Sequence, residues 1–279
     1  MSNTVDATLT TSQLAANSVP PAEGFVCPIA NIATRARPLG PPRTGKVRCS
    51  IASSASSTDS NPANFQENGD ASLLDVDIDV DHIVRRFHVR ATEGNQGLTT
   101  AGHLFEPLIR EFEKDVFDLV TLQIQTSYFG DADVSASAAA FSTANLKTLI
   151  EANSGNPRTL LVAKAAFLNL AGDLTLGADG LWRYPGVDGG VYEASLSGDG
   201  HTVLAGPTAL AWHMERPTSF DRIPPNEINV REIVLPRLKI AAWSCWWFDL
   251  RTRTNWLSVE GLFGVGKADV GALTFAADP

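Results

Sequence analysis

One long amphipathic segment constrains the fold of this chain more than any other feature. From Leu104 to Ile124, apolar side chains recur three and four residues apart, and charged side chains lie mainly opposite them. The apolar stripe consists of Phe105, Leu108, Ile109, Phe112, Val116, Leu119 and Val120. Pro107 predicts that the helix begins close to Leu104, because proline is tolerated in a first turn. A helix of this length spans about 30 Å, so it must bury one long face against the rest of the chain.

Alternating apolar and polar residues predict strands along most of the remaining chain. The predicted strands are 46–52, 74–90 with a bulge near Ile83 and Val84, 159–163, 203–205, 209–214, 228–235, 238–248 and 256–259, with further short strands in 172–200. Two shorter helices are predicted, one at 143–153 capped by Ser142 or Thr143, the other at 165–171. Sheets beside a few helices predict an α+β fold.

Two polar segments are predicted to extend from the body. Residues 1–45 contain six prolines and few large apolar side chains, which predicts an extended arm. Disorder is the alternative for this arm, although scattered apolar residues could anchor it to another surface. These anchors are Phe25, Ile29, Ile32 and Leu39. Residues 53–70 are rich in Ser, Asn and Asp and lie between two predicted strands, so they predict a hairpin with a long polar tip.

Composition excludes several classes of protein. The hydrophobic content of 44% supports a sizeable core, while charges interrupt every apolar run before the length of a membrane helix. The formal net charge of −9 argues against a nucleic-acid-binding body, although the run from Arg35 to Arg48 is basic. Cys27, Cys49 and Cys245 are widely spaced and odd in number, which argues against a disulfide framework and indicates synthesis in a reducing cytoplasm.

One segment approaches a nucleotide-binding motif. Gly261 to Lys267 matches the G-x-x-x-x-G-K pattern, but Ala268 stands where a phosphate-binding loop needs Ser or Thr to hold Mg²⁺. The loop also needs a helix and further strands after it, and few residues follow. A glycine-rich turn between strands is therefore the preferred interpretation, and an α/β nucleotide hydrolase using 261–267 is the alternative.

The remaining polar patterns predict no catalytic, cofactor or metal site. The run DVDIDVD lacks the Gly and Glu of a calcium loop, since Val80 and Arg86 stand at those positions. It predicts a strand with one acidic face, either solvated or met by the basic arm of a neighbouring subunit. The five histidines are His82, His88, His103, His201 and His213, and they show no metal-ligand spacing. No G-x-S-x-G nucleophile motif is present.

Four tryptophans are concentrated near the C-terminal end, at Trp243, Trp246, Trp247 and Trp256. Packing in the core or at a subunit interface is the favoured interpretation. Stacking on bases or sugars is the alternative, and the neighbouring Arg251 and Arg253 keep it open.

The order of these parts resembles the Hong Kong 97-type fold of tailed-bacteriophage major capsid proteins. Three stretches carry most of the resemblance: VRRFHVRATEGNQGLTTAGHLFEPLIREFEKDVFDLV, LKTLIEANSGNPRTLLVAKAAFLNL with DGLWRYPG, and INVREIVLPRLKIAAWSCWWFDLRTRTNW with KADVGALTF. The resemblance covers nearly the whole chain and lies in the shared order, because the family has no catalytic signature. One departure is that no long charged helical scaffolding segment precedes the arm.

The resemblance implies a division of the chain and a function. It implies an N-terminal arm (1–45), a protruding hairpin called the E-loop (46–91), a peripheral domain with a spine helix (92–140), an axial domain (141–225), return strands of the peripheral domain (226–260) and a C-terminal axial strand (261–279). The chain would not be an enzyme. It would assemble with itself, as hexamers and pentamers, into an icosahedral shell that encloses double-stranded DNA without binding its sequence.

The same resemblance implies partners and a location. Separate scaffolding, portal and decoration proteins are possible partners, no membrane is involved, and the protein would belong to the virion after assembly in the cytoplasm of a bacterial host. The alternative within this fold is the shell of a cellular nanocompartment resembling encapsulin. Some members of the family join an E-loop lysine covalently to a neighbouring asparagine. Lys46 stands at the base of the predicted hairpin and the next lysine is Lys114, so non-covalent shells are expected.

Overall fold

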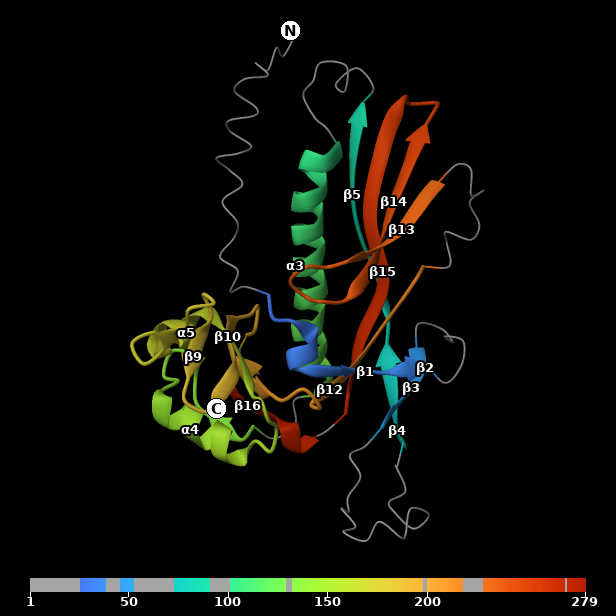
Figure 1. The fold of residues 1–279 in the computed structure, drawn as a ribbon. Coiled ribbons are helices and arrows are strands. Elements are labelled where there is room, and N and C mark those ends of the chain that lie inside the picture. The colour runs from blue at the N-terminus through green and yellow to red at the C-terminus, as the bar shows by residue number, and fades with distance from the viewer. Residues whose placement is uncertain are drawn as a thin grey trace.

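The described residues form three sheets, one long helix and two short helices, arranged as Figure 1 shows. The computed structural model describes residues 26–38, 46–52, 73–90, 101–128, 132–197, 200–217, 228–268 and 270–279. Among these residues, no helix is both long enough and apolar enough to cross a membrane. The mixture of sheets with few helices confirms the predicted α+β class.

Strand β15 (Thr254–Lys267) is the centre of a six-stranded sheet. Along one edge it pairs with β5 (Asp81–Arg90), and along the other with β14 (Ala241–Asp249) and then β12 (Leu210–Glu215), all antiparallel. Beyond these lie β13 (Ile228–Val234), which pairs with β14, and β1 (Ala33–Arg35), which pairs parallel with β12. This one strand therefore connects the two halves of the sheet, as the long red ribbon in Figure 1 shows.

Helix α3 (Ala101–Tyr128) packs along β15 and β5 and confirms the predicted long helix. Phe112, Val116, Val120 and Ile124 are fully buried in the largest core cluster. The helix begins earlier than Pro107 predicted, so the proline lies inside it. At this position the proline removes the helical hydrogen bond to the carbonyl of residue 103.

A second sheet of seven strands forms a compact lobe beside the helix, which we call the small-strand lobe. Its order is β6 (Val134–Ser135), β16 (Leu273–Ala277), β11 (Thr202–Ala205), β7 (Thr159–Val162), β10 (Val187–Glu193), β9 (Trp182–Tyr184) and β8 (Thr175–Leu176). The predicted short helices are present as α4 (Thr143–Ala152) and α5 (Lys164–Leu170). Ser142 occupies the N-cap position of α4 with an extended backbone, but its side chain donates to Asn145 Oδ1 and makes no capping hydrogen bond, so the predicted cap is wrong in this respect. Fully buried leucines from both helices and from β7 fill the core of this lobe.

The predicted long strand at 74–90 is wrong in one respect, because it is two strands in two different sheets. Strand β4 (Leu73–Asp79) pairs with β3 (Lys46–Ala52), and the short β2 (Arg37–Pro38) pairs with the far edge of β3. The chain leaves strand geometry at Val80, not near Ile83 and Val84. Strand β5 then enters the six-stranded sheet. The projecting hairpin is thus formed by β3 and β4, and its tip at 53–72 lies outside the described residues.

The arm predicted for residues 1–45 is also wrong in part. Residues 26–38 belong to the body, since Ile29 in the 3-10 turn η2 (Ile29–Asn31) and Ile32 are fully buried in the main core. The backbone N–H of Ile29 donates to the carbonyl of Leu238 at 3.2 Å, and β1 extends the six-stranded sheet. These apolar residues anchor the segment to its own subunit. Phe25 and Leu39 lie outside the described residues.

Candidate functional site

The candidate site is the place where the β3–β4 hairpin leaves the body, which we call the hairpin base. Here β4 crosses one face of β15, and two glycines make room for it. A Cβ atom at Gly264 would lie 2.0 Å from the carbonyl oxygen of Asp79, and one at Gly266 would lie 2.5 Å from Val76 Cγ1. Val76 and Ile78 are buried in the resulting contact. Any side chain at these glycines would therefore push the hairpin off the sheet.

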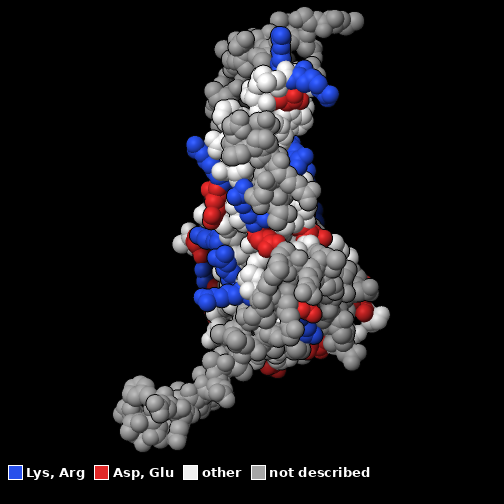
Figure 2. Space-filling model, turned by 90° about the vertical axis from the view of Figure 1, so that its right-hand side faces the viewer, with Lys and Arg blue, Asp and Glu red and all other residues white. Residues whose placement is uncertain are grey.

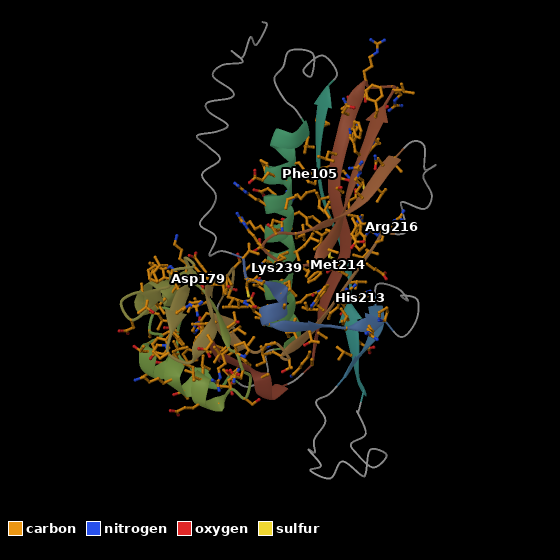
Figure 3. The ribbon with its side chains drawn as sticks, viewed as in Figure 1. Phe105, Asp179, His213, Met214, Arg216 and Lys239 are labelled. Atoms are coloured by element: carbon orange, nitrogen blue, oxygen red, sulfur yellow. The ribbon has the colours of Figure 1, made fainter. Side chains whose placement is uncertain are left out.

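This packing corrects the interpretation of residues 261–267. The segment is not a turn between strands, because it lies inside the 14-residue strand β15. The element that follows it is the three-residue 3-10 turn η5 (Val270–Ala272), not a helix that could bind phosphate. Gly261 has its own structural reason, since a Cβ there would lie 2.2 Å from Met214 Cε (Figure 3). The glycines serve close packing, and the nucleotide hydrolase alternative is wrong.

Gln123 fastens the hairpin base to helix α3. Its Nε2 donates to the carbonyl of Asp79 at 3.2 Å, and its Oε1 accepts the backbone N–H of Val265 at 2.9 Å. The side chain is 9% exposed and uses both ends of its amide. One residue thus connects the helix, the end of β4 and the central strand.

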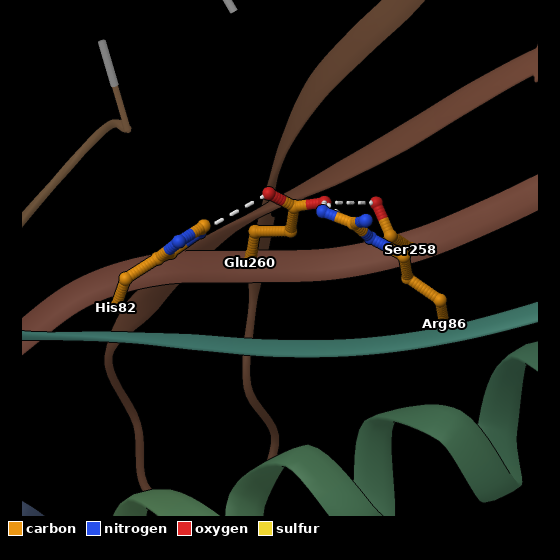
Figure 4. Close-up of polar contacts among 4 residues, drawn as sticks. All are labelled: His82, Arg86, Ser258 and Glu260. Atoms are coloured by element: carbon orange, nitrogen blue, oxygen red, sulfur yellow. Dashed lines mark hydrogen bonds and ion pairs between the residues drawn. The ribbon is translucent and has the colours of Figure 1, made fainter. Parts of the chain in front are cut away.

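A buried carboxylate, Glu260 on β15, holds β5 from the face opposite the helix (Figure 4). Its Oε1 accepts from Ser258 Oγ at 2.7 Å and from Arg86 Nη2 at 3.2 Å, and its Oε2 lies 3.2 Å from His82 Nε2. His82 and Arg86 flank Val84, the register partner of Glu260. A carboxylate that is 2% exposed needs such partners, because an unpaired buried charge is costly. The cluster therefore ties the two strands together at the root of the hairpin.

Cys245 lies opposite Ser258 on the neighbouring strand β14. Burial raises the pKa of its thiol to about 12, with the Glu260 carboxylate adding to the effect. Cys27 is also buried, and desolvation raises its pKa strongly. Both thiols are therefore protonated near neutral pH and are poor nucleophiles.

On its other face, β5 is joined to α3 by an ion pair between Arg85 and Asp115. Arg85 Nη2 donates to Asp115 Oδ1 at 2.6 Å, and Nε donates to Oδ2 in a second contact. The pKa of the Arg85 guanidinium is raised, chiefly by its hydrogen bond to Asp115. The two ends of this pair are partly exposed, so it positions the strand with a small gain in stability.

The acidic face of β4 has basic residues opposite it on the same hairpin. In the β3–β4 register, Lys46 pairs with Asp79 and Arg48 with Asp77. The backbone register therefore places two acidic positions of β4 opposite two basic positions of β3. The contact of the acidic face with a neighbour's basic arm stays a prediction.

Glu113 on α3 holds the connection between β13 and β14 through hydrogen bonds. Its Oε1 accepts the backbone N–H groups of Arg237 at 2.7 Å and Leu238 at 3.4 Å, and Figure 3 labels Lys239 of the same connection. Oε2 has no hydrogen-bond partner, and Arg237 Nε lies 3.9 Å from it. Burial raises the pKa of this carboxyl above its ordinary value. The β13–β14 connection is thus held by the Glu113 carboxylate, whose charged form is destabilised by burial.

The four tryptophans do not form one site. Trp247 and Trp256 stack with ring centroids 5.9 Å apart, and the His88 ring lies 4.9 Å from Trp256. Trp246, next to Trp247 on β14, points to the other face of the sheet and is 51% exposed. No shared groove with paired aromatic faces results, so packing remains the favoured interpretation over base stacking.

The histidines are used in separate local contacts. His201 is buried with Nε2 2.7 Å from the carbonyl of Ala136, and His213 Nε2 lies 3.4 Å from Glu215 Oε2. Within the described part of the chain, no three His, Cys, Asp or Glu side chains are grouped so that they could hold a metal ion. The side chain of His103 lies outside that part. The contacts of the hairpin base attach the hairpin to the body of the subunit.

The residues that hold the hairpin base were not predicted from sequence, although two carried a signal. Glu260 is an acid inside the apolar run of β15, and Gln123 lies beside Ile124 on the apolar stripe of the helix. A polar residue at a core position indicates a buried partner. The partners themselves lie far away in sequence, which is why the pattern alone could not identify them.

No known protein family matches the sequence, and no curated protein matches it. Solved structures do match. A chain of Microbacterium phage Oxtober96 is 10% identical over 94% of both chains with a TM-score of 0.50. The virus-like particle of Pyrococcus furiosus is 14% identical over 98% of this chain and 100% of that chain, with a TM-score of 0.49. The capsid of the native GTA particle is 11% identical over 91% and 92%, with a TM-score of 0.49.

At these identities the likeness shows a shared fold alone. The resemblance to phage capsid proteins predicted from the sequence is confirmed at that level.

Proposed function

We propose that this chain is the major capsid protein of a tailed phage, which assembles with itself into a closed icosahedral shell. The observation that supports it most is the fold shared with a phage chain over 94% of both lengths. The role is structural, and we assign no catalytic, cofactor or metal residue. A subunit of a shell needs a rigid body and projecting elements that reach its neighbours.

In this proposal, the parts of the molecule take the roles of the Hong Kong 97-type fold. The β3–β4 hairpin is the E-loop within 46–91, α3 is the spine helix within 92–140, and the small-strand lobe is the axial domain. The lobe differs from the proposed range 141–225, because it includes β6 and β16, while β12 belongs to the six-stranded sheet. Residues 226–260 are the return strands and 261–279 lead to the terminal strand β16. The proposed boundary at 260 falls inside β15, so the two regions it separates share one strand.

The hairpin base explains how a subunit could direct its hairpin. The glycine crossing and Glu260 hold the root of the hairpin on β15, and Gln123 and the Arg85–Asp115 pair hold it on α3. A hairpin fixed at its root presents its far end to a neighbour in one orientation, which lowers the entropy lost on contact. Interfaces of this kind would build hexamers and pentamers, with scaffolding, portal and decoration proteins as separate partners.

We further propose that the shell encloses a double-stranded DNA genome, not a cargo enzyme. The net charge of −9 would keep the packaged DNA from adhering to the wall. The two cases differ in what particles from an infected culture contain. Nuclease-protected DNA of a defined length supports the virion, and particles that contain a single enzyme and no DNA would support the nanocompartment.

Light scattering of the purified protein tests the assembly itself. We expect capsomers or closed particles whose abundance rises with protein concentration, because interfaces form by mass action. A compact monomer at every concentration, under conditions where circular dichroism shows folded protein, would refute the proposal.

Truncation of the arm provides a second test of the proposal, and the burial of Ile29 and Ile32 decides where to truncate. An arm that extended over the whole of 1–45 could be removed without unfolding the body, but Ile29, Ile32 and β1 belong to the body. Removal of 1–25 is therefore the informative truncation. We propose that it leaves a folded subunit that fails to close shells, whereas removal of 1–44 unfolds the subunit. Normal particles from the shorter truncation would contradict a role for the arm.

We also propose that the shells are non-covalent. Lys46 is the first residue of β3 and pairs with Asp79 in the register, at the root of the hairpin and not at its tip. Boiled particles should then give a single band at the monomer mass of 29.8 kDa on a denaturing gel. A ladder of covalent multimers would refute this and make Lys46 the first residue to replace.

A further inference from the structure

Three exposed apolar side chains form a row on β14 and the turn that follows it. Trp246, Phe248 and Leu250 are 51%, 45% and 82% exposed. Trp246 and Phe248 are two residues apart on β14 and so lie on one face of the strand, and Leu250 follows them in the turn. That face begins with Ala242, which is fully buried, and becomes exposed as β14 runs past the area that α3 covers. We call these three residues the apolar row.

The row is on the same side of the sheet as α3. Trp246 pairs with Leu257, which packs against the main core, and the neighbouring Ser244 pairs with Val259 of that core. Exposed side chains of this size offer on the order of 300 Å² of apolar area, which is comparable to the largest apolar patch of a typical soluble monomer. Contiguous apolar area of this kind marks a contact surface, whereas single exposed leucines do not.

The charges around the row are mainly positive. Arg231 pairs with Ser244 in the register and so shares the face of the row, and Arg251 and Arg253 are exposed in the turn. Figure 2 shows Lys and Arg side chains at the end of the molecule where β14 turns into β15. The acid of this turn, Asp249, accepts from the backbone N–H of Arg251 at 2.9 Å and from Thr252 Oγ1 at 2.7 Å. Around the row, three exposed arginines thus stand beside one carboxylate, so the rim is mainly cationic.

The turn that carries Leu250 is held in one shape. Hydrogen bonds, first that from the Thr252 side chain, lower the pKa of Asp249, so the carboxylate that organises the turn stays ionised near neutral pH. Arg253 has a left-handed backbone with φ of 51°, which closes the turn. A fixed apolar tip with two cations loses little entropy when it is covered.

We infer that the apolar row with Arg231, Arg251 and Arg253 is a contact surface for an acidic surface of a second copy of this chain. A second copy of the chain fits these charges, because the chain has a net charge of −9 while the rim of the row is cationic. The area is smaller than the roughly 800 Å² that each partner buries in a stable interface, so the row forms the apolar centre of a larger contact. The inference rests on the proposed self-assembly and assigns one of its surfaces.

A photo-crosslinker in place of Leu250 tests the occupant directly. The photoreactive amino acid benzoylphenylalanine is introduced at this position, particles are purified and irradiated, and products are separated on a denaturing gel and identified by mass spectrometry. We expect dimers joined to an acidic segment of another copy, in particles and not in dilute subunits. Products confined to one chain, to nucleic acid or to a foreign protein would overturn the inference.

Substitutions test the energetic role of the row. Phe248→Ser with Leu250→Ser should raise the concentration needed for particle formation by at least about tenfold, as expected for central interface residues. Arg251→Glu with Arg253→Glu, at exposed positions that do not threaten folding, should raise it in a salt-dependent way. The matched control is Leu168→Ser with Leu176→Ser, which are 63% and 59% exposed on the small-strand lobe. We expect the control to change that concentration by less than about twofold.

The outcomes separate this inference from the proposed function. If wild-type protein forms no particles, the proposed function fails and the inference fails with it. If wild type assembles and the row variants assemble equally well as folded subunits, or the control variant is impaired as much, the inference alone fails.

Discussion

The small-strand lobe and the hairpin base differ in how they use buried polar groups. In the lobe, Asn153 satisfies neighbouring strands within one unit: Nδ2 donates to the carbonyls of Leu204 and Ala272 at 2.9 and 3.0 Å, and Oδ1 accepts from the Gly155 N–H. At the hairpin base, Gln123 and Glu260 connect separate elements, and Glu260 also contacts the partly exposed side chains of His82 and Arg86. The lobe is thus stabilised locally, whereas the hairpin base fixes the direction of an element that leaves the body.

The largest expected effect is at the glycine crossing. Gly264→Ala should lower the free energy of unfolding by about 3 kcal/mol, because its Cβ would meet the backbone of Asp79, which cannot rotate away. Hydrogen exchange should show faster exchange in β4 with little change in β7 and β11. The control is Gly172→Ala, where a Cβ meets nothing within 4 Å and the change should stay within about 0.5 kcal/mol. If both variants lowered the free energy of unfolding equally, the close packing of Gly264 against β4 would not be what holds the hairpin base.

Asn153→Ala is the corresponding test in the lobe. It should cost about 2 kcal/mol, because two backbone carbonyls and one N–H would lose a buried partner. The faster exchange should now be confined to β11 and β16, with β4 unchanged. Asn169→Ala is the matched control, since its exposed side chain also donates to two carbonyls. If Asn153→Ala loosens β4 as much as β11, the two regions are not independent.

Glu260→Gln should cost about 1 to 2 kcal/mol by urea unfolding, because the amide keeps the volume but removes the charge that Arg86 and His82 face. Arg85→Ala, which breaks the partly exposed pair on the other face of β5, should cost about 0.5 kcal/mol or less. A larger loss from Arg85→Ala would mean that the helix side, and not the Glu260 cluster, holds the strand.

The smallest effect concerns the pH dependence contributed by Glu113. Burial raises its pKa in the folded protein above that of the unfolded chain. The folded state therefore binds the proton more tightly, so this contribution to stability is full below the unfolded pKa and is lost as pH rises through the folded pKa. The free energy of unfolding of wild type minus that of Glu113→Gln should fall with rising pH across this range. A difference that is constant or rises with pH would contradict the assignment.

The sequence predicted those elements whose pattern is local. Strand β3 has the predicted bounds, and the apolar stripe identified α3, because both patterns depend on neighbouring residues. The second half of β15 was missed because its glycines weaken a strand pattern, and their cause, the crossing of β4, lies far away in sequence. The same distance hid the partners of Glu260 and Gln123. The break at Val80 was placed a few residues late because β4 and β5 both alternate.

The arm shows a further limit. Prolines and sparse apolar residues correctly indicated irregular structure, but Ile29 and Ile32 were assigned to another surface when they belong to the core of their own subunit. A pattern gives the burial of a residue and not the identity of the surface that buries it.

The central claim, that this subunit builds a closed shell, is tested most directly by an electron micrograph of the purified protein. The account predicts hollow particles of uniform size, with hexamers and pentamers resolved after averaging. A field of separate compact subunits at every concentration, from protein that is folded by circular dichroism, would contradict it.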